Sequence, residues 1–388
     1  MELAFLLAKS DIGLSREEAL AVVEHESSWL HGNLLIISPK KQEDVRELQD
    51  RLAFTLSIHE VLFSCPVSRL LEKMEHYPWK SIYHENFCVR AHHLSISQQY
   101  RHNTDEKNRK HSIHPINANN HDRCNGQNDP NENKDSKEHN GIGDTGNFSE
   151  QELARFIWKA VEHPVAKLRN SKTAIHLFFY NGHVVCARQL TRDSKKFEER
   201  RPHLRIFSHS GSMHPRLARA LVNLLGAKQG DKVMDPCCGS GGFLIEAAMM
   251  GLGAEGYDIN RKMVWGCMRN MAQQGIAHYQ AAVKDALSLE GKWSHIITDL
   301  PYGLNSVAMS RNERVSMKRS VVEKENLEEF YSSFFLKLKE ILGKRAVIVM
   351  PHFVDHRRII AGAGLRIEKE FEQYVHGSLT RRIMVLTT

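Results

Sequence analysis

One stretch near the middle of the chain constrains the fold more than any other: residues 233–246, which read Val-Met-Asp-Pro-Cys-Cys-Gly-Ser-Gly-Gly-Phe-Leu-Ile-Glu. It begins as an apolar run, ends that run at Asp235, and passes through a glycine-rich turn into a segment with helical apolar spacing. This order predicts a strand, a tight loop and a helix in a doubly wound α/β domain. In such domains ligands bind outside the carboxyl ends of the strands, so we expect the loop to line a binding site.

The glycines of this loop indicate a bound cofactor that is not a dinucleotide. Gly239 and Gly241 permit positive φ and a close approach of the backbone to a ligand. A dinucleotide fingerprint needs a third glycine where this chain has Leu244, and the Gly-Lys-Ser/Thr of a P-loop is absent. The carboxylate of Asp235 would repel a pyrophosphate, but it suits the ammonium group of S-adenosylmethionine.

Three further acids follow apolar runs and are expected at the same edge of the sheet. Asp258 ends the run that begins at Ala254, where it is placed to accept hydrogen bonds from ribose hydroxyls. Asp285 follows the next run and is a candidate acceptor for the adenine amine, with a helix cap as the alternative. Asp299 ends the strand expected over residues 294–298.

The sequence Asp299-Leu300-Pro301-Tyr302 has the residues that methylation of an exocyclic base amine needs. Such an amine becomes nucleophilic when acceptors hold its protons, and the Asp299 carboxylate and the Leu300 carbonyl can be those acceptors. Pro301 disfavours a helical conformation at Leu300, which keeps that carbonyl directed outward. Tyr302 offers a ring face on which a flipped base can stack.

Longer segments around these motifs resemble the THUMP-containing tRNA guanine-N2 methyltransferases and, within them, the archaeal enzymes of guanosine 10. The resemblance rests on residues 197–205, residues 211–224, the two motifs above, and the His-Gly-Ser-Leu-Thr-Arg sequence at 376–381. It is continuous from Phe197 to the end of the chain and weaker over the N-terminal half. It implies a Rossmann-like methyltransferase domain that uses S-adenosylmethionine, with Ser212 and Met213 closing over the cofactor.

The candidate cofactor residues are Ser212, Met213, Asp235, Pro236, Cys237, Gly239, Gly241, Asp258, Ile259, Asp285 and Ala286. The candidate catalytic residues are Asp299, Leu300, Pro301 and Tyr302. This chain departs from the usual family pattern in having Asp-Leu-Pro-Tyr for Asp-Pro-Pro-Tyr, His-Ser-Gly for His-Pro-Gly, and a Cys-Cys pair in the glycine loop. The acid and the second proline are kept, so we expect the catalytic geometry to survive.

The N-terminal half reads as an α+β region in two parts. Residues 1–66 alternate strand-like runs with helical stretches, as in a small ferredoxin-like domain, and Ser15 begins a capping-box pattern. Residues 67–196 contain a strand, a helix and a hairpin centred on Asn181-Gly182. By resemblance this second part is a THUMP module, which grips the 3′ end of tRNA in relatives. A linker over 197–210 then leads to the methyltransferase domain at 211–388.

Residues 97–147 form an insertion dominated by Asn, His, Asp, Lys and Ser. They contain too few apolar residues to offset the entropy of ordering, so we expect a disordered insertion within the THUMP module. Its histidines and Cys124 match no standard metal site, and no metal is expected.

Two clusters of basic residues are candidates for contact with RNA phosphates, although a charge run is also typical of a solvated face. The first is Arg200, Arg201 and Arg205, and the second is Arg311, Arg314, Lys318 and Arg319. The formal net charge of +7 favours an acidic partner such as tRNA.

Composition sets the compartment and the broad class. Seven cysteines without a C-x-x-C pair argue against a disulfide scaffold and a zinc ribbon. No apolar run approaches the length of a membrane span, and residues 1–7 do not form a signal peptide. We therefore expect a cytoplasmic protein, monomeric and without an obligate protein partner.

Two other functions compete with methylation of tRNA. The glycine loop also resembles that of adenine amino-methyltransferases acting on DNA, but those commonly carry Asn-Pro-Pro-aromatic and lack an N-terminal RNA-binding module. A non-catalytic RNA-binding protein with a degenerate methyltransferase fold is the third possibility. The intact acids and glycines argue against it, and a cofactor-binding assay would discriminate.

Overall fold

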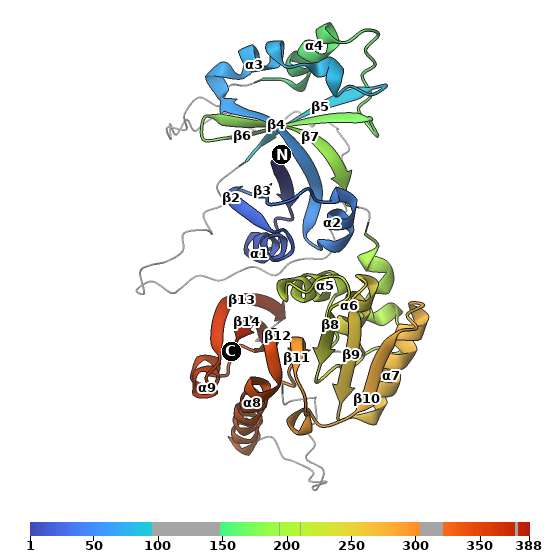
Figure 1. Cartoon of the computed structure of the whole chain (residues 1–388), viewed down its shortest axis with the longest axis vertical. Helices are drawn as coiled ribbons and strands as arrows, with labels where there is room; N and C mark the ends of the chain where they lie inside the picture. Colours follow the sequence, from blue (N-terminus) through green and yellow to red (C-terminus); the bar gives the residue numbers. More distant parts are fainter. Residues whose placement is uncertain (95–147, 194, 210, 303–320, 377–378) are drawn as a thin grey trace, which may run out of the picture. The chain divides into compact units, whose positions relative to one another are not determined.

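The computed structural model describes residues 1–94, 148–193, 195–209, 211–302, 321–376 and 379–388 (Figure 1). These residues form two compact units, and each is considered by itself. The first unit comprises Met1–Ser10, Glu26–Pro39 and Ser57–Arg192, and the second comprises Asp11–His25, Lys40–Leu56 and Asp193–Thr388. The insertion expected at 97–147 lies outside the described residues, and the domain boundaries drawn from the sequence stay predictions.

The first unit is built on one mixed sheet with the strand order β2-β3-β1-β4-β7-β6-β5. The strands are β1 (Leu3–Leu7), β2 (His25–His31), β3 (Leu34–Pro39), β4 (Thr55–Pro66), β5 (Phe87–His93), β6 (Thr173–Tyr180) and β7 (His183–Arg192). Helices α3 (Leu70–His76) and α4 (Glu150–Ala160) bury Leu70, Met74, Leu153 and Ile157 in one core with strand residues such as Leu177. Because β4 lies between β1 and β7, the strands expected for a ferredoxin-like part and for a THUMP part share a single sheet.

The turn between β6 and β7 confirms the hairpin expected at Asn181-Gly182. Both residues have positive φ, +43° and +72°, and the two strands pair antiparallel from Tyr180 and His183. A two-residue turn with positive φ at both positions matches the twist of the flanking strands, which is why this dipeptide is a strong hairpin signal.

The helix expected to begin at Ser15 begins earlier, so the expected capping box is wrong. Helix α1 (Ile12–Val22) has Asp11 as its N-cap, whose carboxylate accepts a hydrogen bond of 2.9 Å from the Leu14 N–H. Ser15 lies buried inside the helix. Glu18, the other half of the expected box, instead accepts hydrogen bonds from the backbone N–H groups of Ala53 and Phe54.

The second unit contains a doubly wound sheet with the strand order β10-β9-β8-β11-β12-β14-β13. The strands are β8 (Lys232–Asp235), β9 (Gly253–Asp258), β10 (Tyr279–Val283), β11 (Trp293–Asp299), β12 (Leu342–Pro351), β13 (Arg366–His376) and β14 (Leu379–Thr387). The helices are α1, α2 (Val45–Arg51), α5 (Pro215–Leu224), α6 (Gly242–Met249), α7 (Arg261–Gln273), α8 (Val321–Ile341) and α9 (His356–Gly362). All neighbouring strands are parallel except where β14 pairs with β12 and β13.

The order of this sheet confirms the expected Rossmann-like architecture and fixes where a ligand would bind. From β8 the chain first proceeds outward through β9 to β10 and then returns to β11 on the other side of β8. The direction of winding reverses between β8 and β11, which is the topological switch point at which doubly wound sheets bind ligands. The glycine-rich loop follows β8, and the Asp299 turn follows β11.

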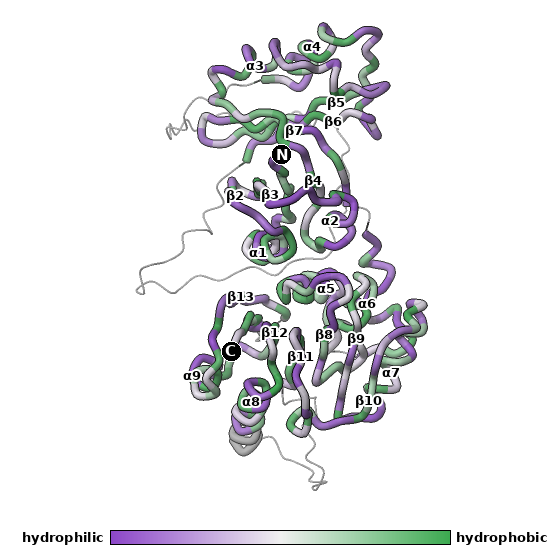
Figure 2. Tube along the Cα trace, viewed as in Figure 1, coloured by the Kyte–Doolittle hydropathy of each residue, from purple (hydrophilic) through white to green (hydrophobic). Residues whose placement is uncertain are grey.

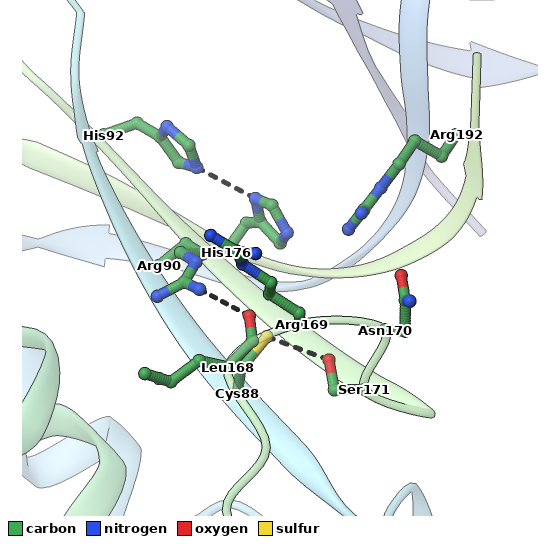
Figure 3. Close-up of a pocket in the computed structure, with 9 residues that line it drawn as sticks. All are labelled: Cys88, Arg90, His92, Leu168, Arg169, Asn170, Ser171, His176 and Arg192. Carbon is green, nitrogen blue, oxygen red and sulfur yellow. Dashed lines mark hydrogen bonds between the residues drawn. The ribbon is translucent and has the colours of Figure 1, made fainter. Parts of the chain in front are cut away.

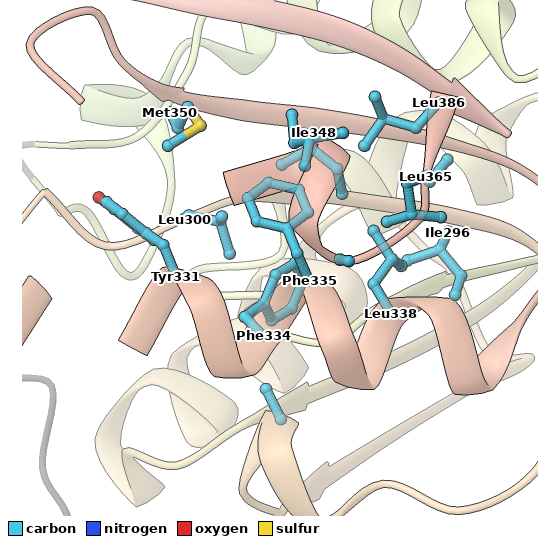
Figure 4. Close-up of a cluster of buried hydrophobic side chains, with 14 of the residues drawn as sticks. Ile296, Leu300, Tyr331, Phe334, Phe335, Leu338, Ile348, Met350, Leu365 and Leu386 are labelled. Carbon is cyan, nitrogen blue, oxygen red and sulfur yellow. The ribbon is translucent and has the colours of Figure 1, made fainter. Parts of the chain in front are cut away.

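An aromatic core holds α8 against the sheet of this unit. In Figure 4 the side chains of Tyr331, Phe334, Phe335 and Leu338 project from α8 toward residues of the strands, including Ile348, and all of them are buried. Burying side chains of this size contributes about 1.5 to 3 kcal/mol each. The core therefore fixes the strand ends that carry the candidate site.

Helix α5 carries both hydrophobic and hydrophilic residues, as Figure 2 shows, yet almost all of them are buried. Two of its polar side chains form hydrogen bonds to α1 and α2. Asn223 donates to Glu18 and to the Arg51 carbonyl, and Arg219 donates to the Asp50 carbonyl. These bonds explain why α1 and α2 belong to the second unit, although they precede most of the first unit in sequence.

Membrane spans and metal clusters are both absent from the described part of the chain. None of the helices described there combines the length and the apolar composition needed to cross a membrane. Nor do the described residues gather three His, Cys, Asp or Glu side chains into a group that could hold a metal ion.

Candidate active site

The glycine-rich loop connects β8 to α6 and turns sharply at two glycines. Gly239 and Gly241 have φ of +51° and +85°, a region that other residues rarely adopt. A Cβ on Gly241 would lie 2.6 Å from the Sγ of Cys267, so a side chain there would also clash with α7. The loop therefore keeps its backbone close to the strand end, where a ligand can approach it.

Close packing of α6 on the sheet is achieved by a glycine on the strand. Leu244 occupies the position where a dinucleotide fingerprint has a glycine. A Cβ on Gly256 of β9 would lie 2.3 Å from the Leu244 Cδ1, so the absent side chain of Gly256 makes room for Leu244. The expectation that Leu244 is too bulky for close packing is therefore wrong, although the G-x-G-x-x-G spacing itself is still absent, and the compensating role of Gly256 is a feature that the sequence did not reveal.

The carboxyl group of Asp235 ends β8 in a buried position. It is 1% exposed, and its Oδ1 accepts a hydrogen bond of 3.1 Å from the Cys237 N–H. Burial raises the pKa of Asp235 to about 8, and the negative charges of Asp258 and Asp299 add to the shift. A cation bound beside Asp235 would reverse this shift, as the ammonium group of a methionine moiety would do.

The carboxyl group of Asp258 joins the end of β9 to the glycine-rich loop. Its Oδ2 accepts a hydrogen bond of 2.9 Å from the Gly239 N–H, and its Oδ1 accepts one of 2.8 Å from the Asn260 N–H. Burial raises its pKa, while the backbone bonds and His209 oppose the rise. Ile259, the next residue, is 38% exposed beside it.

Asp285 lies after β10 and caps a short 3-10 turn, Ala286–Ser288. Its Oδ1 accepts a hydrogen bond of 2.9 Å from the Leu287 N–H. One oxygen of Asp285 therefore acts as a cap, which is the alternative to a role in the cofactor site. Ala286, in the same turn, is buried. A role for Asp285 toward adenine stays a proposal.

The segment before α5 contacts the glycine-rich loop. The Ser212 and Ser240 hydroxyl oxygens lie 2.9 Å apart, and Met213 is buried. Asn270 of α7, which is fully buried, donates to the Ser240 carbonyl and to the Phe207 carbonyl, each at 2.9 Å. Asn270 therefore holds the loop to the chain that leads into α5, a role that its place in a helix did not reveal.

The turn after β11 is fixed at its backbone on both sides. The Leu300 N–H donates to the Val349 carbonyl at 2.9 Å, and the Tyr331 hydroxyl donates to the Pro301 carbonyl at 2.6 Å. The Leu300 side chain is buried in the core of the sheet. These contacts hold the turn rigidly at the strand end.

The side chains of this turn form a network with one arginine. The Tyr302 hydroxyl donates a hydrogen bond of 2.5 Å to the Asp299 Oδ1. The Arg381 guanidinium donates from its Nε to the Tyr302 hydroxyl oxygen at 3.1 Å, and its Nη2 lies 3.7 Å from the Asp299 Oδ2. Burial raises the pKa of Asp299 to about 6, against the lowering effects of Arg381 and Tyr302. Arg381 lies in the C-terminal segment, residues 376–381, that resembles the methyltransferase family, but the sequence did not indicate a function for this residue.

The candidate cofactor and catalytic residues follow the ends of β8, β9, β10 and β11, except Ser212 and Met213, which lie in the segment before α5.

The residues of the first basic cluster are largely buried. Arg200 is buried and donates to both Glu246 oxygens, at 2.8 and 3.0 Å, and Arg205 is buried with its Nε bonded to the Arg200 carbonyl. Since neither guanidinium is presented to solvent, the expectation that Arg200 and Arg205 contact RNA phosphates is corrected. Arg201 is partly exposed and pairs with Glu198.

The second basic cluster lies outside the described residues. It consists of Arg311, Arg314, Lys318 and Arg319.

The first unit has a basic cavity of about 430 Å³ that no sequence pattern indicated (Figure 3). Arginine side chains from β5, the β7 end and the loop before β6 line it, together with two histidines. The lining residues are Cys88, Arg90, His92, Leu168, Arg169, Asn170, Ser171, His176 and Arg192. Burial lowers the pKa of His176 to about 3, so its ring is neutral near pH 7. Arg90 pairs with Glu150 at 2.8 Å, so the net positive charge of the cavity comes from Arg169 and Arg192.

The chain is similar in sequence to several known proteins. Residues 202–383 match the family UPF0020, described as an RMKL-like methyltransferase domain. Proteins named tRNA (guanine(10)-N2)-dimethyltransferase from Methanothermobacter thermautotrophicus and Pyrococcus abyssi are 37% and 34% identical over 55% and 50% of this chain. These matches cover 61% and 55% of the two relatives, so the chain spans little more than half of their length.

A third relative is matched over nearly its whole length. It is named "Probable tRNA (guanine(10)-N2)-dimethyltransferase", from Methanothermococcus thermolithotrophicus, and is 34% identical over 44% of this chain and 96% of its own length.

Proposed function

This chain belongs to the family of the tRNA (guanine(10)-N2)-dimethyltransferases, and we propose that it transfers methyl groups from S-adenosylmethionine to the N2 amine of a guanosine in tRNA. We propose guanosine 10 as the nucleotide, with one or two methyl groups added. We further propose that the protein acts in the cytoplasm as a monomer.

One observation carries this proposal: the glycine-rich loop and the Asp299 turn end neighbouring parallel strands at the switch point of the sheet. Strands β8 and β11 pair directly, with Val233 opposite His295 and Met234 opposite Ile296. A cofactor against Asp235 and a base against Asp299 would therefore meet at one edge of the sheet.

The residues at the end of β8 and β9 fit S-adenosylmethionine. The loop turns close to the strand ends because Gly239 and Gly241 adopt positive φ, and Asp235 is a buried acid suited to a cationic amino acid moiety. Asp258 would accept from the ribose hydroxyls. When bound, the cofactor supplies a methyl group whose bond to the sulfonium sulfur breaks as the bond to nitrogen forms.

The residues at the end of β11 would activate the amine. The carboxylate of Asp299 and the carbonyl of Leu300 would accept hydrogen bonds from the two amine N–H groups, which leaves the nitrogen lone pair directed at the methyl carbon. After the transfer Asp299 takes one proton from the nitrogen, and the methylated amine is neutral again. Tyr302 would stack on the guanine ring, a contact worth about 1 to 3 kcal/mol.

The first unit is proposed as the RNA-binding half, with a THUMP-like module. Its basic cavity, with Arg169 and Arg192, offers a site of the charge that an RNA phosphate requires. Arg201 and the segment that contains Arg311, Arg314, Lys318 and Arg319 are proposed as further phosphate contacts.

The proposal is tested with purified protein, labelled S-adenosylmethionine and three nucleic acids. These are an unmodified tRNA transcript, the same transcript with guanosine 10 replaced by adenosine, and a DNA duplex. We expect label in the first alone. Label in DNA would favour the adenine amino-methyltransferase alternative, and cofactor binding without transfer to any of the three would favour a non-catalytic RNA-binding protein.

A further inference from the structure

Arg381 lies on β14 with its guanidinium buried at the end of β11. It pairs with Pro351 of β12 and Gln373 of β13, and it is 8% exposed. A buried guanidinium is costly unless its donors and its charge are matched. The groups that pair with the Arg381 guanidinium all belong to the candidate site.

The donors of Arg381 reach three groups from two separate segments. The Nε donates to the Tyr302 hydroxyl oxygen at 3.1 Å, and the Nη2 lies 3.7 Å from the Asp299 Oδ2. The Nη2 also donates to the Gly211 carbonyl at 3.3 Å, directly before Ser212. One side chain thus connects the turn proposed for the substrate with the segment proposed to close over the cofactor.

Tyr302 occupies one of the two carboxylate oxygens of Asp299. Its hydroxyl donates to the Asp299 Oδ1 at 2.5 Å, so an amine that donates to this oxygen would compete with the hydroxyl. Where the amine takes this oxygen, the Tyr302 hydroxyl has to release it. Arg381 then becomes the contact that keeps Asp299 oriented and its charge balanced.

We propose that Arg381 is a positioning residue for methyl transfer: it holds the Asp299 carboxylate ionised and directed at the amine while Tyr302 moves to the base. This inference rests on the proposed function. Arg381 itself touches neither the amine nor the methyl group, and it acts through Asp299.

Two properties of arginine are required, and they can be separated. Its charge favours the ionised carboxylate, and its planar fork reaches Tyr302, Asp299 and Gly211 at the same time. A lysine would supply the charge at one nitrogen without the fork. Arg381→Lys should therefore still favour the ionised form of Asp299, but it should orient the Asp299 carboxylate only in part.

The test compares Arg381→Gln, Arg381→Lys and Arg382→Gln with the wild type. Arg382 is the matched control, since it is the next residue of β14 and pairs instead with Glu370 and Glu372. For Arg381→Gln we expect kcat on tRNA to fall on the order of 100-fold, with the KM for tRNA and the affinity for S-adenosylmethionine within a few fold of wild type. Arg382→Gln should keep the wild-type kcat.

A titration gives a readout that does not depend on activity. The groups that face Asp299 are Arg381, Tyr302, Tyr331 and Asp235. Of these, Arg381 carries the positive charge, so its removal should raise the pKa of Asp299 and shift the acidic limb of kcat/KM to higher pH. A carboxyl carbon NMR titration, with Asp299→Asn to assign the signal, measures this pKa directly. Arg381→Lys should return it toward the wild-type value.

The outcomes separate this inference from the proposed function. Absence of tRNA methylation by the wild-type protein would contradict the proposed function, whereas the inference is judged on the ratio of variant to wild type and on the titration. A wild-type kcat in Arg381→Gln, or an unshifted Asp299 titration in that variant, would overturn it. If Arg381→Gln does not fold, the kcat and titration of Arg381→Lys decide: a full wild-type kcat there overturns the role of the fork.

Discussion

The carboxylate of Asp258, at the end of β9, accepts a hydrogen bond of 2.9 Å from the backbone N–H of Gly239 in the glycine-rich loop. This bond joins the acid proposed for the ribose to the loop proposed for the rest of the cofactor. Because Gly239 has positive φ, the loop conformation and the position of the acid depend on each other.

Asp258→Ala should weaken binding of S-adenosylmethionine by about 1.5 to 3 kcal/mol, because this variant removes hydrogen bonds to a charged acceptor. Isothermal calorimetry measures this change. Asp355→Ala is the control, since it removes a carboxylate from the same unit that accepts a backbone hydrogen bond as the N-cap of α9, and it should leave the affinity unchanged. An unchanged dissociation constant in Asp258→Ala would remove this residue from the cofactor site.

Binding of S-adenosylmethionine should release a proton from Asp235. The pKa of this buried acid is raised to about 8, so the carboxyl group is protonated near pH 7 in the free protein. Ionisation beside a bound cation requires that proton to leave, and the affinity should therefore rise between about pH 6 and about pH 7.5. Calorimetry at pH 7 in two buffers of different ionisation enthalpy should detect release of about one proton.

The matched variant for this linkage is Asp235→Asn, which has no proton to release. It should bind the cofactor more weakly, with an affinity that depends less on pH. A wild-type affinity that is flat over the same pH range, with no proton released, would show that Asp235 does not face the cation.

The basic cavity of the first unit should contribute to tRNA binding by neutralising phosphates. A double variant, Arg169→Gln with Arg192→Gln, should weaken tRNA binding and lower the slope of log K against log salt by about one for each phosphate left unneutralised. Its affinity for S-adenosylmethionine should not change. The control removes two positive charges from α4 of the same unit, Arg155→Gln with Lys159→Gln, which do not line the cavity. An equal decrease in tRNA affinity in the two double variants would indicate a general effect of positive charge and would argue against a phosphate-binding site in the cavity.

A chain that lacks residues 98–147, bridged by a short Gly/Ser linker, should fold and methylate tRNA. The described residues nearest to this segment on either side both contact Phe179: the Leu94 N–H donates to the Phe179 carbonyl at 2.9 Å, and the Phe148 ring lies 6.3 Å from the Phe179 ring. A short linker can therefore close the loop at little cost. Thermal unfolding and tRNA methylation measure the result, and a failure to obtain soluble protein would show that the segment is structural.

The elements that the sequence predicted are those with local signals. The strand, loop and helix from Lys232 to Met249 follow from an apolar run and closely spaced glycines, and the hairpin at Asn181-Gly182 follows from a dipeptide that accepts positive φ. Strand β2 (His25–His31) was missed because its only two apolar residues, Trp29 and Leu30, are adjacent and none of its residues is fully buried. A strand without an apolar face gives no periodic signal.

The parts that the sequence could not predict depend on contacts between distant residues. Arg381 meets Asp299 only because β14 inserts beside β12, and no local pattern gives that strand order. Glu18 looked like half of a capping box, but Asp11 lies one turn earlier, and the buried backbone N–H groups of Ala53 and Phe54 use the Glu18 carboxylate instead. The burial of Arg200 likewise follows from Glu246, which is 46 residues away in the chain.

Asp299 is proposed to accept a hydrogen bond from a guanine amine and then to take one proton from it, and one measurement tests this role most directly. Unmodified tRNA is incubated with S-adenosylmethionine and either the wild-type protein or Asp299→Ala, and the nucleosides are then identified by mass spectrometry. We expect N2-methylated guanosine from the wild type and none from Asp299→Ala, while the variant binds the cofactor within a few fold of wild type. Methylated guanosine formed at an undiminished rate by Asp299→Ala, or a wild-type product methylated on another base, would contradict the account.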